Sequence, residues 1–330
     1  MSGAESEVAV SICIPTWNRC LLLQEAMQSV FGQTFEDFEL LVCDNASDDG
    51  TEQVVRSFLD PRIRYVRNSR NIGHRENWNR CLSLARGEYI AILPDDDAML
   101  PENIARKVEI LRRNPQVGLI HSKFHLIDEH GDIIRWNTNW GHGPDREVDA
   151  IEKREGLLTA FINTINVPTV LFRRVCYERL GGFSARVRLA FDWEYWMRIA
   201  VFYDTAFLAE PLVKWRIHPQ SITKTNVCNP VVQLKEDLTA KETVFTTCAR
   251  ALPGWRRLER QMWRNMAERL FRCAQEMLAQ GWSELDARKF VLQMCSCYPG
   301  LLVERRLWRI LALSVLHQPV SELLTGKAPA

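Results

Sequence analysis

The sequence lacks a dominant charge and a long hydrophobic run, and we expect no secretory leader. Its 330 residues carry 42 Lys and Arg against 41 Asp and Glu, a formal net charge of +1. No chain-wide basic field attracts nucleic acid, so we expect no nucleic-acid partner. The best hydrophobic run, 307–316, contains Arg309 and is too short to cross a membrane. Segment 1–8 is polar and acidic, unlike a signal peptide. These absences predict a cytoplasmic protein.

The cysteines are not spaced for a disulfide framework or a zinc site. In a chain without a leader we expect the ten thiols to be reduced. Cys13 and Cys43 lie in apolar runs typical of buried strands, where Cys behaves as a small hydrophobe. Cys295 and Cys297 form a C-x-C pair, but no second pair or histidine cluster follows at zinc spacing.

The first half of the chain alternates between two hydrophobic periods. We expect strands at 8–14, 38–43, 63–66, 88–93 and 117–126, and helices at 19–31, 51–59, 76–85 and 102–112. Strands and helices that alternate with short links predict a mostly parallel sheet covered on both faces. Ligands of such sheets bind beyond the carboxyl ends of the strands. Two acidic clusters, 44–49 and 95–97, follow predicted strands and therefore belong at that edge.

The second half is less regular until about residue 225. We expect a loop over 129–150, a helix over 151–163, a strand over 167–172, a helix over 192–202 and an extended segment over 206–217 that Pro211 interrupts. Farther on, apolar residues recur at steps of three and four: Trp255, Leu258, Met262, Met266, Leu270, Ala274 and Met277. We divide the chain into a catalytic domain, 1–225, and a helical extension, 226–330. The domain has a nucleotide-binding half, 1–125, and an acceptor half with the catalytic base, 126–225.

The basic, amphipathic region 255–316 leaves two alternatives open. Its apolar stripe packs on the rest of the protein, as such stripes usually do. Alternatively, it lies on an anionic membrane, which would place the protein at the inner face beside a lipid-linked acceptor. The exposure of Trp263 and Trp308 distinguishes the two.

Three adjacent carboxylates, Asp95, Asp96 and Asp97, raise one another's pKa unless a cation neutralises them. Mg²⁺ or Mn²⁺ typically takes one or two carboxylates and completes its shell with substrate phosphates. The motif therefore indicates a metal–diphosphate site, and the alternative is a solvated acidic turn.

Three further clusters have a functional and a structural interpretation. The corner of Pro15, Thr16, Trp17, Asn18 and Arg19 can stack a base and bind phosphate, or it can be a packed turn. Asp192 lies among aromatic residues, which favours a raised pKa and a general-base role, although it can also cap a helix. His218 can join a metal shell and Arg216 can contact a phosphate, or both belong to a surface turn.

Together these motifs resemble glycosyltransferase family 2, the inverting enzymes of the GT-A nucleotide-sugar fold. The resemblance runs from about residue 8 to 223 through eight segments in the family's order. They are SICIPTWNR, the approach from Gln33-Thr34 to Glu39, LLVCDNASDDGT, NIGHRENWN, ARGEYIAILPDDDAMLPENI, VLFRR with LGGF, FDWEYWMR and WRIHPQS. The implied fold is a Rossmann-like, mostly parallel sheet flanked by helices, followed by a helical extension.

The resemblance assigns roles residue by residue. Thr16 and Trp17 match the nucleoside pocket, and Asp44 and Asn45 match the acidic pair that contacts ribose and base. The family more often has Asp where Asn45 stands, but an Asn carbonyl can still accept from a pyrimidine N3–H. Asn71 and Arg75 match the approach to the diphosphate or sugar, and Asp95 the ribose side. The implied metal ligands are Asp96, with Asp97 beside it, and His218; Pro94 replaces the motif's usual first acid.

The implied reaction is a single displacement from a nucleotide-diphosphate sugar, with UDP or dTDP favoured, to a hydroxyl acceptor. Asp192 is the implied base, a divalent Mg or Mn ion the implied cofactor, and a saccharide or lipid-linked acceptor of surface polysaccharide or glycolipid assembly the implied substrate. Two other functions stay open: a nucleotidyltransferase, although PTWNRC lacks a Gly- or Lys-rich phosphate loop, and a non-catalytic nucleotide-sugar-binding or scaffold protein.

Overall fold

The computed structural model of the chain describes residues 8–138, 149–160, 163–221 and 230–303. These residues belong to two compact units. The first takes in the chain up to 154 together with 163–185 and 191–219, and the second takes in 155–162, 186–190 and the chain from 220 onward. Two short stretches of the region expected to be catalytic therefore pack with the C-terminal helices.

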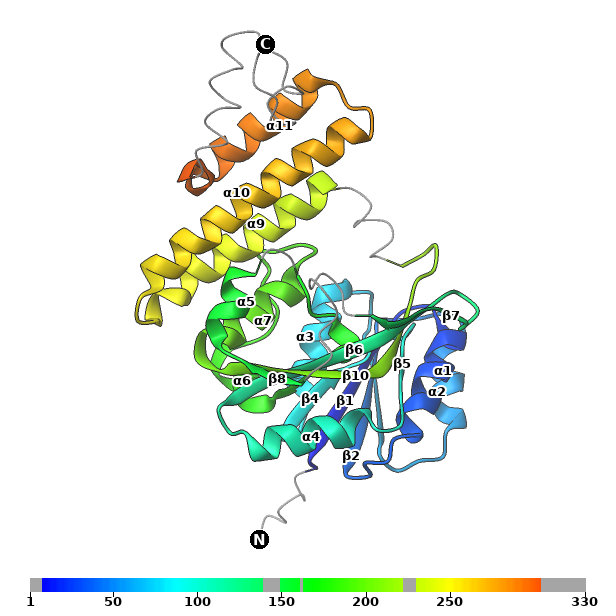
Figure 1. Ribbon diagram of the computed structural model, residues 1–330. Coiled ribbons are helices and arrows are strands. Elements are labelled where there is room, and N and C mark those ends of the chain that lie inside the picture. The colour runs from blue at the N-terminus through cyan, green and yellow to red at the C-terminus, as the bar shows by residue number, and fades with distance from the viewer. Residues whose placement is uncertain (1–7, 139–148, 161–162, 222–229, 304–330) are drawn as a thin grey trace, which may run out of the picture. The chain divides into compact units, whose positions relative to one another are not determined.

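One sheet organises the first unit (Figure 1). Its strands are β1 (Val10–Thr16), β2 (Phe38–Asp44), β3 (Ile63–Arg67), β4 (Tyr89–Ile92), β5 (Ala98–Met99), β6 (Val117–Ile127), β7 (Ile133–Thr138), β8 (Ala150–Glu152), β9 (Leu171–Arg173) and β10 (Asp204–Arg216). Their order is β3-β2-β1-β4-β9-β6-β10-β5, with β7 beside β6 and β8 beside β10. The strands from β3 to β4 are parallel, as are β6 and β10, whereas β9 is antiparallel to both of its neighbours. The predicted sheet is confirmed, with antiparallel strands added.

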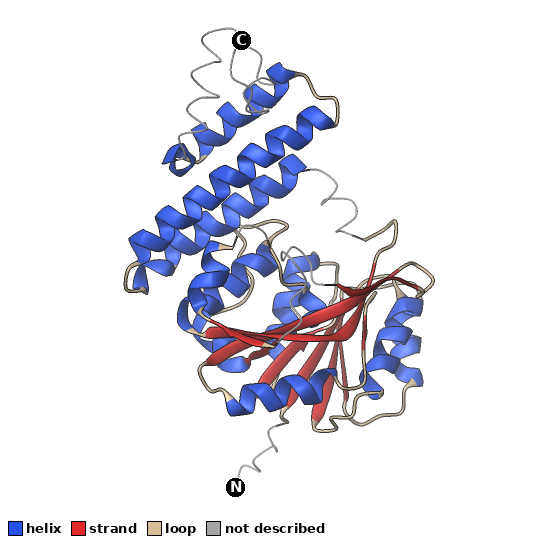
Figure 2. Cartoon of the chain, in the orientation of Figure 1, coloured by secondary structure: helices blue, strands red, loops and turns tan. Residues whose placement is uncertain are grey.

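Helices cover both faces of this sheet (Figure 2). They are α1 (Cys20–Phe31), α2 (Thr51–Ser57), α3 (His74–Leu84), α4 (Asn103–Arg113), α6 (Arg174–Leu180) and α7 (Phe191–Phe202), with a 3-10 turn, η1 (Val167–Thr169). On one face, α1 and α4 pack over alternate residues of the strands, among them Ile12, Leu40 and Ala91. This period of two follows from the pleat of a strand, which points successive side chains to opposite faces.

Three local expectations were wrong. Residues 129–150 are not all loop, because β7 pairs with β6 and β8 starts at Ala150. The helix expected over 151–163 is reduced to α5 (Arg154–Thr159). The single strand expected over 167–172 begins as η1 and continues as β9. The interruption expected at Pro211 is a shift in the register of β10 on β6, and the strand itself continues through the proline.

The second unit is helical. Besides α5 it contains α9 (Pro230–Thr247), η2 (Ala249–Ala251), α10 (Trp255–Ala279), α11 (Glu284–Cys297) and η3 (Pro299–Val303). The apolar stripe of α10 is core, because Leu258, Met262, Met266, Leu270, Ala274 and Met277 are all buried. The Trp263 ring also packs so closely on Gly300 that a Cβ there would lie 2.3 Å from it. Trp308 lies outside the described residues.

Two further expectations concern the cysteine thiols and membrane-spanning helices. The nine cysteines within the described ranges are free thiols. In the same ranges, no helix combines the length and the apolar character that crossing a membrane requires.

Candidate functional site

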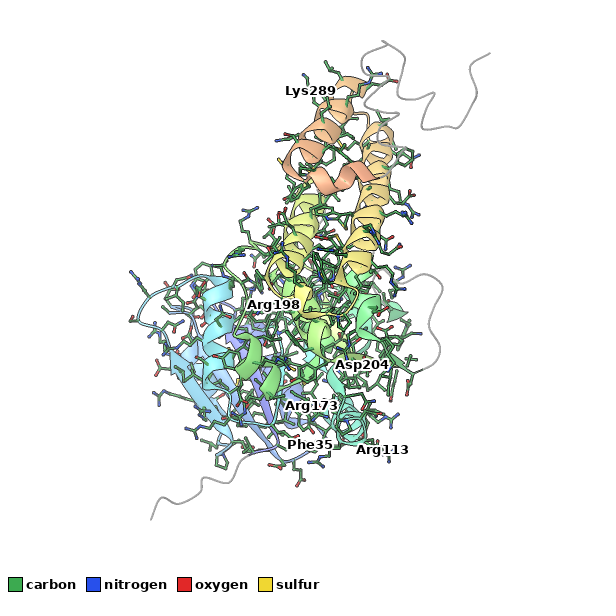
Figure 3. The ribbon with its side chains drawn as sticks, turned by 90° about the vertical axis from the view of Figure 1, so that its left-hand side faces the viewer. Phe35, Arg113, Arg173, Arg198, Asp204 and Lys289 are labelled. Atoms are coloured by element: carbon green, nitrogen blue, oxygen red, sulfur yellow. The ribbon has the colours of Figure 1, made fainter. Side chains whose placement is uncertain are left out.

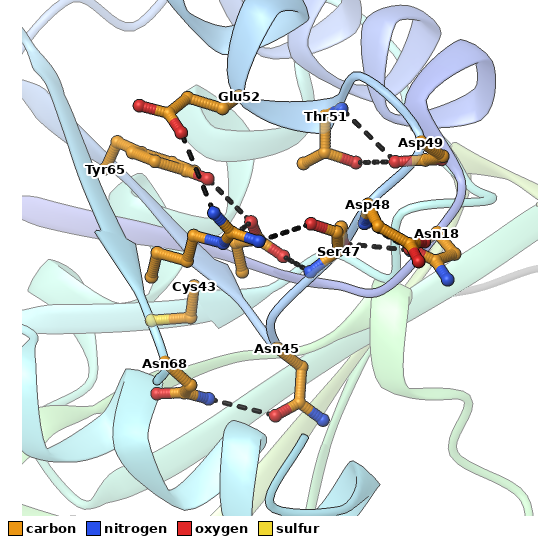
Figure 4. Close-up of polar contacts among 12 residues, drawn as sticks. Asn18, Cys43, Asn45, Ser47, Asp48, Asp49, Thr51, Glu52, Tyr65 and Asn68 are labelled. Atoms are coloured by element: carbon orange, nitrogen blue, oxygen red, sulfur yellow. Dashed lines mark hydrogen bonds and ion pairs between the residues drawn. The ribbon is translucent and has the colours of Figure 1, made fainter. Parts of the chain in front are cut away.

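The carboxyl ends of β1, β2 and β4 meet at one edge of the sheet, and their loops are tied together there. The N–H of Asn18 donates to Ser47 Oγ at 2.9 Å, and the N–H of Asp48 donates to Asn18 Oδ1 at 2.9 Å (Figure 4). Asn18 and Ala46 both have positive φ, 52° and 65°. Left-handed backbone is uncommon for residues other than glycine and gathers at functional sites.

The Asp44 carboxylate holds this corner from beneath. It is buried, and its Oδ1 accepts the N–H of Ser47 at 2.9 Å while its Oδ2 accepts the hydroxyl of Tyr65 at 2.6 Å. The guanidinium of Arg67 lies 3.5 Å from the same Oδ2. These contacts show that Asp44 fixes the shape of the loop that follows β2.

Asn45 belongs to a network of amide side chains. Its Oδ1 accepts from Asn68 Nδ2 at 3.0 Å and from the N–H of Ile72 at 2.9 Å, and its Nδ2 donates to Asn71 Oδ1 at 2.8 Å. A carbonyl oxygen has two lone pairs, and both are taken here. A base N3–H can therefore bind Asn45 only by displacing one of these donors. Asn71, expected near the diphosphate or the sugar, is part of this network, and its role toward the donor remains a prediction.

Trp17 is exposed at this corner, whereas Thr16 is buried. Half of the Trp17 side chain is exposed, 51%, which leaves a ring face for stacking. The Thr16 hydroxyl donates to Asp95 Oδ2 at 2.7 Å and so joins β1 to the acidic motif after β4. Pro15, the residue before it, is buried within β1 and pairs with Cys43 of β2.

The acidic motif surrounds a positively charged side chain. Arg19 Nη1 lies 3.1 Å from Asp95 Oδ1 and 2.8 Å from Asp96 Oδ2. His218 Nε2 lies 3.0 Å from that same Asp96 Oδ2. Four residues from three distant parts of the sequence, together with Thr16, therefore converge on one point at the sheet edge.

The two carboxyl groups differ in acidity. Burial and the neighbouring Asp96 charge raise the pKa of Asp95 to about 6. Burial also acts on Asp96, but the hydrogen bond from His218 and the charge of Arg19 hold its pKa below the usual value. Asp96 is therefore the carboxylate that stays ionised most readily, which suits a cation ligand.

Asp97 and Arg216 form a separate, buried contact. Asp97 Oδ1 accepts the N–H of Arg216 at 2.8 Å, and burial raises the pKa of this carboxyl well above its usual range. The Arg216 guanidinium donates to the Asp96 carbonyl at 2.9 Å and binds Glu25. Arg216 thus fixes the acidic loop, and its contact with a phosphate remains a prediction.

Within the described ranges, no three His, Cys, Asp or Glu side chains are arranged to hold a metal by themselves. The Asp96 carboxylate and the His218 imidazole are nevertheless oxygen and nitrogen donors that lie 3.0 Å apart, and Asp96 also contacts a positive charge, the Arg19 guanidinium. Two protein ligands suit Mg²⁺ or Mn²⁺ where substrate phosphates supply the rest of the shell. The donor set therefore fits such an ion only together with a phosphorylated ligand.

Asp192 lies in the first turn of α7. Burial raises its pKa to about 6, and the Asn163 side chain opposes that rise by donating to Asp192 Oδ2 at 3.4 Å. Asn163 is itself fixed, because its Oδ1 accepts the N–H of Ile165 at 3.0 Å. The sequence analysis missed Asn163, since nothing in its neighbourhood marks it and its partner is 29 residues away.

His74 is a second residue that the sequence analysis missed. It starts α3 directly after the NIG segment, and its ring packs at 4.6 Å from Trp78 and 5.4 Å from Phe191, the residue before Asp192. Desolvation and the positive charge of Arg19 lower its pKa to about 4. A neutral imidazole therefore lies between the acidic motif and the start of α7.

The described contacts of Arg75 do not reach this cluster. Its guanidinium binds the adjacent Glu76 at 2.8 Å. Its role toward the donor remains a prediction.

Comparisons with known proteins point to one family. Residues 11–172 match the profile described as Glycosyl transferase family 2. An uncharacterized glycosyltransferase of Methanocaldococcus jannaschii is 28% identical over 223 residues, covering 66% of this chain and 73% of the relative. A Campylobacter jejuni protein, GalNAc(5)-diNAcBac-PP-undecaprenol beta-1,3-glucosyltransferase, is 32% identical over 156 residues, 46% of this chain and 48% of its own length.

A solved structure shares the fold. The crystal structure of S. aureus TarS 1–349 in complex with UDP-GlcNAc has a TM-score of 0.68 with this chain. It covers 92% of this chain and 83% of its own, at 13% identity.

Proposed function

Because the chain belongs to glycosyl transferase family 2, we propose that it transfers a sugar, with inversion, from a UDP- or dTDP-sugar to a hydroxyl of a saccharide or lipid-linked acceptor. The observation that carries the proposal is the convergence of Thr16, Arg19, Asp95, Asp96 and His218 at the sheet edge. The undecaprenol-linked acceptor named for the C. jejuni relative supports a role in surface polysaccharide or glycolipid assembly.

In this proposal the donor lies along the strand ends. The exposed ring of Trp17 stacks on the base, and Asp95 and Thr16 face the ribose. Asp96 and His218 hold a divalent cation, with Asp97 beside them, and the cation supplies positive charge for the diphosphate leaving group. Arg19 and Arg75 contribute further charge toward the donor.

Asp192 is the base in this proposal. Its carboxylate takes the proton of the acceptor hydroxyl as the oxygen attacks the anomeric carbon, and Asn163 fixes the direction of Asp192 Oδ2. With a pKa of about 6 the group is ionised at neutral pH and is still basic enough to accept a proton. General-base assistance contributes on the order of 10²–10⁴-fold in rate.

Thermal unfolding with a panel of nucleotide sugars, with and without Mn²⁺, tests the donor class. A ligand at 100 times its Kd stabilises by about 2.7 kcal/mol. We expect a UDP- or dTDP-sugar to stabilise only with Mn²⁺ present, and Asp96→Ala to lose that effect. Release of pyrophosphate would indicate nucleotidyl transfer instead, and donor binding without any turnover would indicate a binding protein.

A further inference from the structure

The position that a divalent cation would take is held by the protein's own arginine. Arg19 Nη1 lies within 3.1 Å of Asp95 Oδ1 and 2.8 Å of Asp96 Oδ2, and His218 Nε2 approaches that same Asp96 oxygen at 3.0 Å. The Arg19 side chain is 23% exposed and the Asp96 side chain 13%. The contact is therefore shielded from most of the solvent, and salt screens it less than a surface pair.

Arg19 and a divalent cation exclude each other at Asp96. A metal–carboxylate bond of about 2.0–2.1 Å for Mg²⁺ puts the ion on the oxygen that Arg19 now contacts. Two positive groups at such a distance also repel each other strongly outside bulk water. Moving Arg19 away without a new anionic partner breaks the ion pairs of a partly buried guanidinium with Asp95 and Asp96, which is costly.

A diphosphate provides that new partner. Guanidinium groups bind phosphate oxygens through paired hydrogen bonds, and Arg19 lies at the start of α1, a position where backbone N–H groups favour anions. The remaining two ligands, Asp96 and His218, do not complete a metal shell in the described protein. The ion therefore depends on the diphosphate twice: for its missing ligands and for removal of Arg19.

We propose that Arg19 is a resident counter-ion that keeps the carboxylate pair closed to metal in the donor-free protein. The nucleoside diphosphate draws its guanidinium away, so that donor and metal bind cooperatively. The inference rests on the proposed function, because it takes the acidic motif as the metal–diphosphate site. By linkage, the factor by which UDP raises the affinity for Mn²⁺ equals the factor by which Mn²⁺ raises the affinity for UDP.

Electron paramagnetic resonance of free Mn²⁺ measures this coupling directly on the full chain, without a turnover assay. In the wild type we expect weak binding of Mn²⁺ alone and an affinity at least about tenfold higher with saturating UDP, within the usual range of couplings. Arg19→Gln should bind Mn²⁺ alone more tightly than the wild type and gain less from UDP. Arg19→Lys keeps the charge and should bind Mn²⁺ alone as weakly as the wild type.

Arg62→Gln is the matched control, because Arg62 pairs with Asp60 at 2.7 Å away from the acidic motif. It should leave both affinities unchanged. The inference is overturned if Arg19→Gln binds Mn²⁺ no more tightly than the wild type, or if UDP and Mn²⁺ bind the wild type independently. The second measurement needs no variant and stands even if Arg19→Gln fails to fold. Absence of Mn²⁺ binding to wild type and Arg19→Gln, with and without UDP, would instead refute the metal site of the proposed function.

Discussion

Asp192 and its neighbour Asn163 determine the pH range in which the proposed base can work. The Asp192 carboxyl has a pKa of about 6 because it is buried, and only its ionised form can accept a proton. We expect kcat/KM to fall as the pH drops below about 6. Asp192→Asn should keep UDP binding and lose on the order of 10²–10⁴-fold in kcat. Near-normal turnover of that variant would refute the assignment of the base.

The Asn163→Leu variant tests how the base is positioned. The side chain of Asn163 donates to Asp192 Oδ2 and thereby favours the ionised carboxylate. Its loss should raise the pKa of Asp192, so the acidic limb of the kcat/KM profile should move to higher pH. Asn163→Gln, which retains an amide, should recover part of the shift. A lower rate with an unshifted profile would mean that Asn163 acts only on local packing.

At the scale of elements, the buried Arg198 side chain joins α7 to the turn before it. The Arg198 guanidinium binds Glu194 at 2.7 Å and donates to the carbonyls of Leu180 at 2.8 Å and Gly182 at 2.6 Å (Figure 3 marks Arg198). The Asn79 side chain of α3 holds the same turn through the N–H of Phe183 at 2.7 Å. Hydrogen bonds therefore connect the GGF turn to α3 and to α7.

Arg198→Met should be strongly destabilising. The side chains of Arg198 and Glu194 are 10% and 1% exposed, and removing one partner leaves an uncompensated buried charge, at a cost of about 3–5 kcal/mol. Arg56→Met is the control, because Arg56 makes a pair of the same i,i+4 spacing with Glu52 at the surface. There we expect a change of less than about 1 kcal/mol. Chemical denaturation measures both, and equal effects would contradict the argument.

Most elements of the first unit could be predicted, because a strand or helix leaves its period in neighbouring residues. The strand β7, IIRWNT, was missed because it lies within a stretch rich in Gly and Asp, and its pairing with β6 is visible only in the structure. Contacts between distant residues leave no such local signal. Asp97 meets the N–H of Arg216 across 119 positions, so the sequence could not indicate that its carboxylate is already engaged. His74, in contrast, lies within the segment NIGHRENWN and could have been predicted as a site residue.

In the helical unit, the Glu236 side chain of α9 holds the backbone of residues 188–190 in place. The Glu236 carboxylate accepts the N–H groups of Arg188, Leu189 and Ala190, at 3.2, 2.7 and 3.4 Å. These residues directly precede Phe191, where α7 begins. Glu236→Gln should weaken charge-assisted hydrogen bonds and lower the free energy of unfolding by about 1–3 kcal/mol. Amide hydrogen exchange at 188–190 should become faster, and unchanged protection there would contradict the prediction.

At the scale of the whole molecule, the described structure limits the surfaces through which the chain could bind a membrane. The apolar stripe of α10 is buried, so it is not available to insert into lipid. The exposed side of the same helix instead presents Arg256, Arg260 and Arg264 at intervals of four residues. An exposed row of arginines favours an electrostatic contact with anionic headgroups. The predicted membrane contact would then be sensitive to salt.

Flotation of the full chain with phosphatidylglycerol vesicles tests this expectation. Each arginine near an anionic surface contributes about 1 kcal/mol, so changing all three to Glu should weaken binding by at least about 100-fold, the equivalent of 3 kcal/mol. High salt should act in the same direction. Changing Arg56, Arg112 and Arg113 to Glu alters the net charge equally and should have little effect. Binding that resists both salt and the α10 substitutions would require insertion of another apolar surface, and absence of binding by the wild type would exclude the membrane contact.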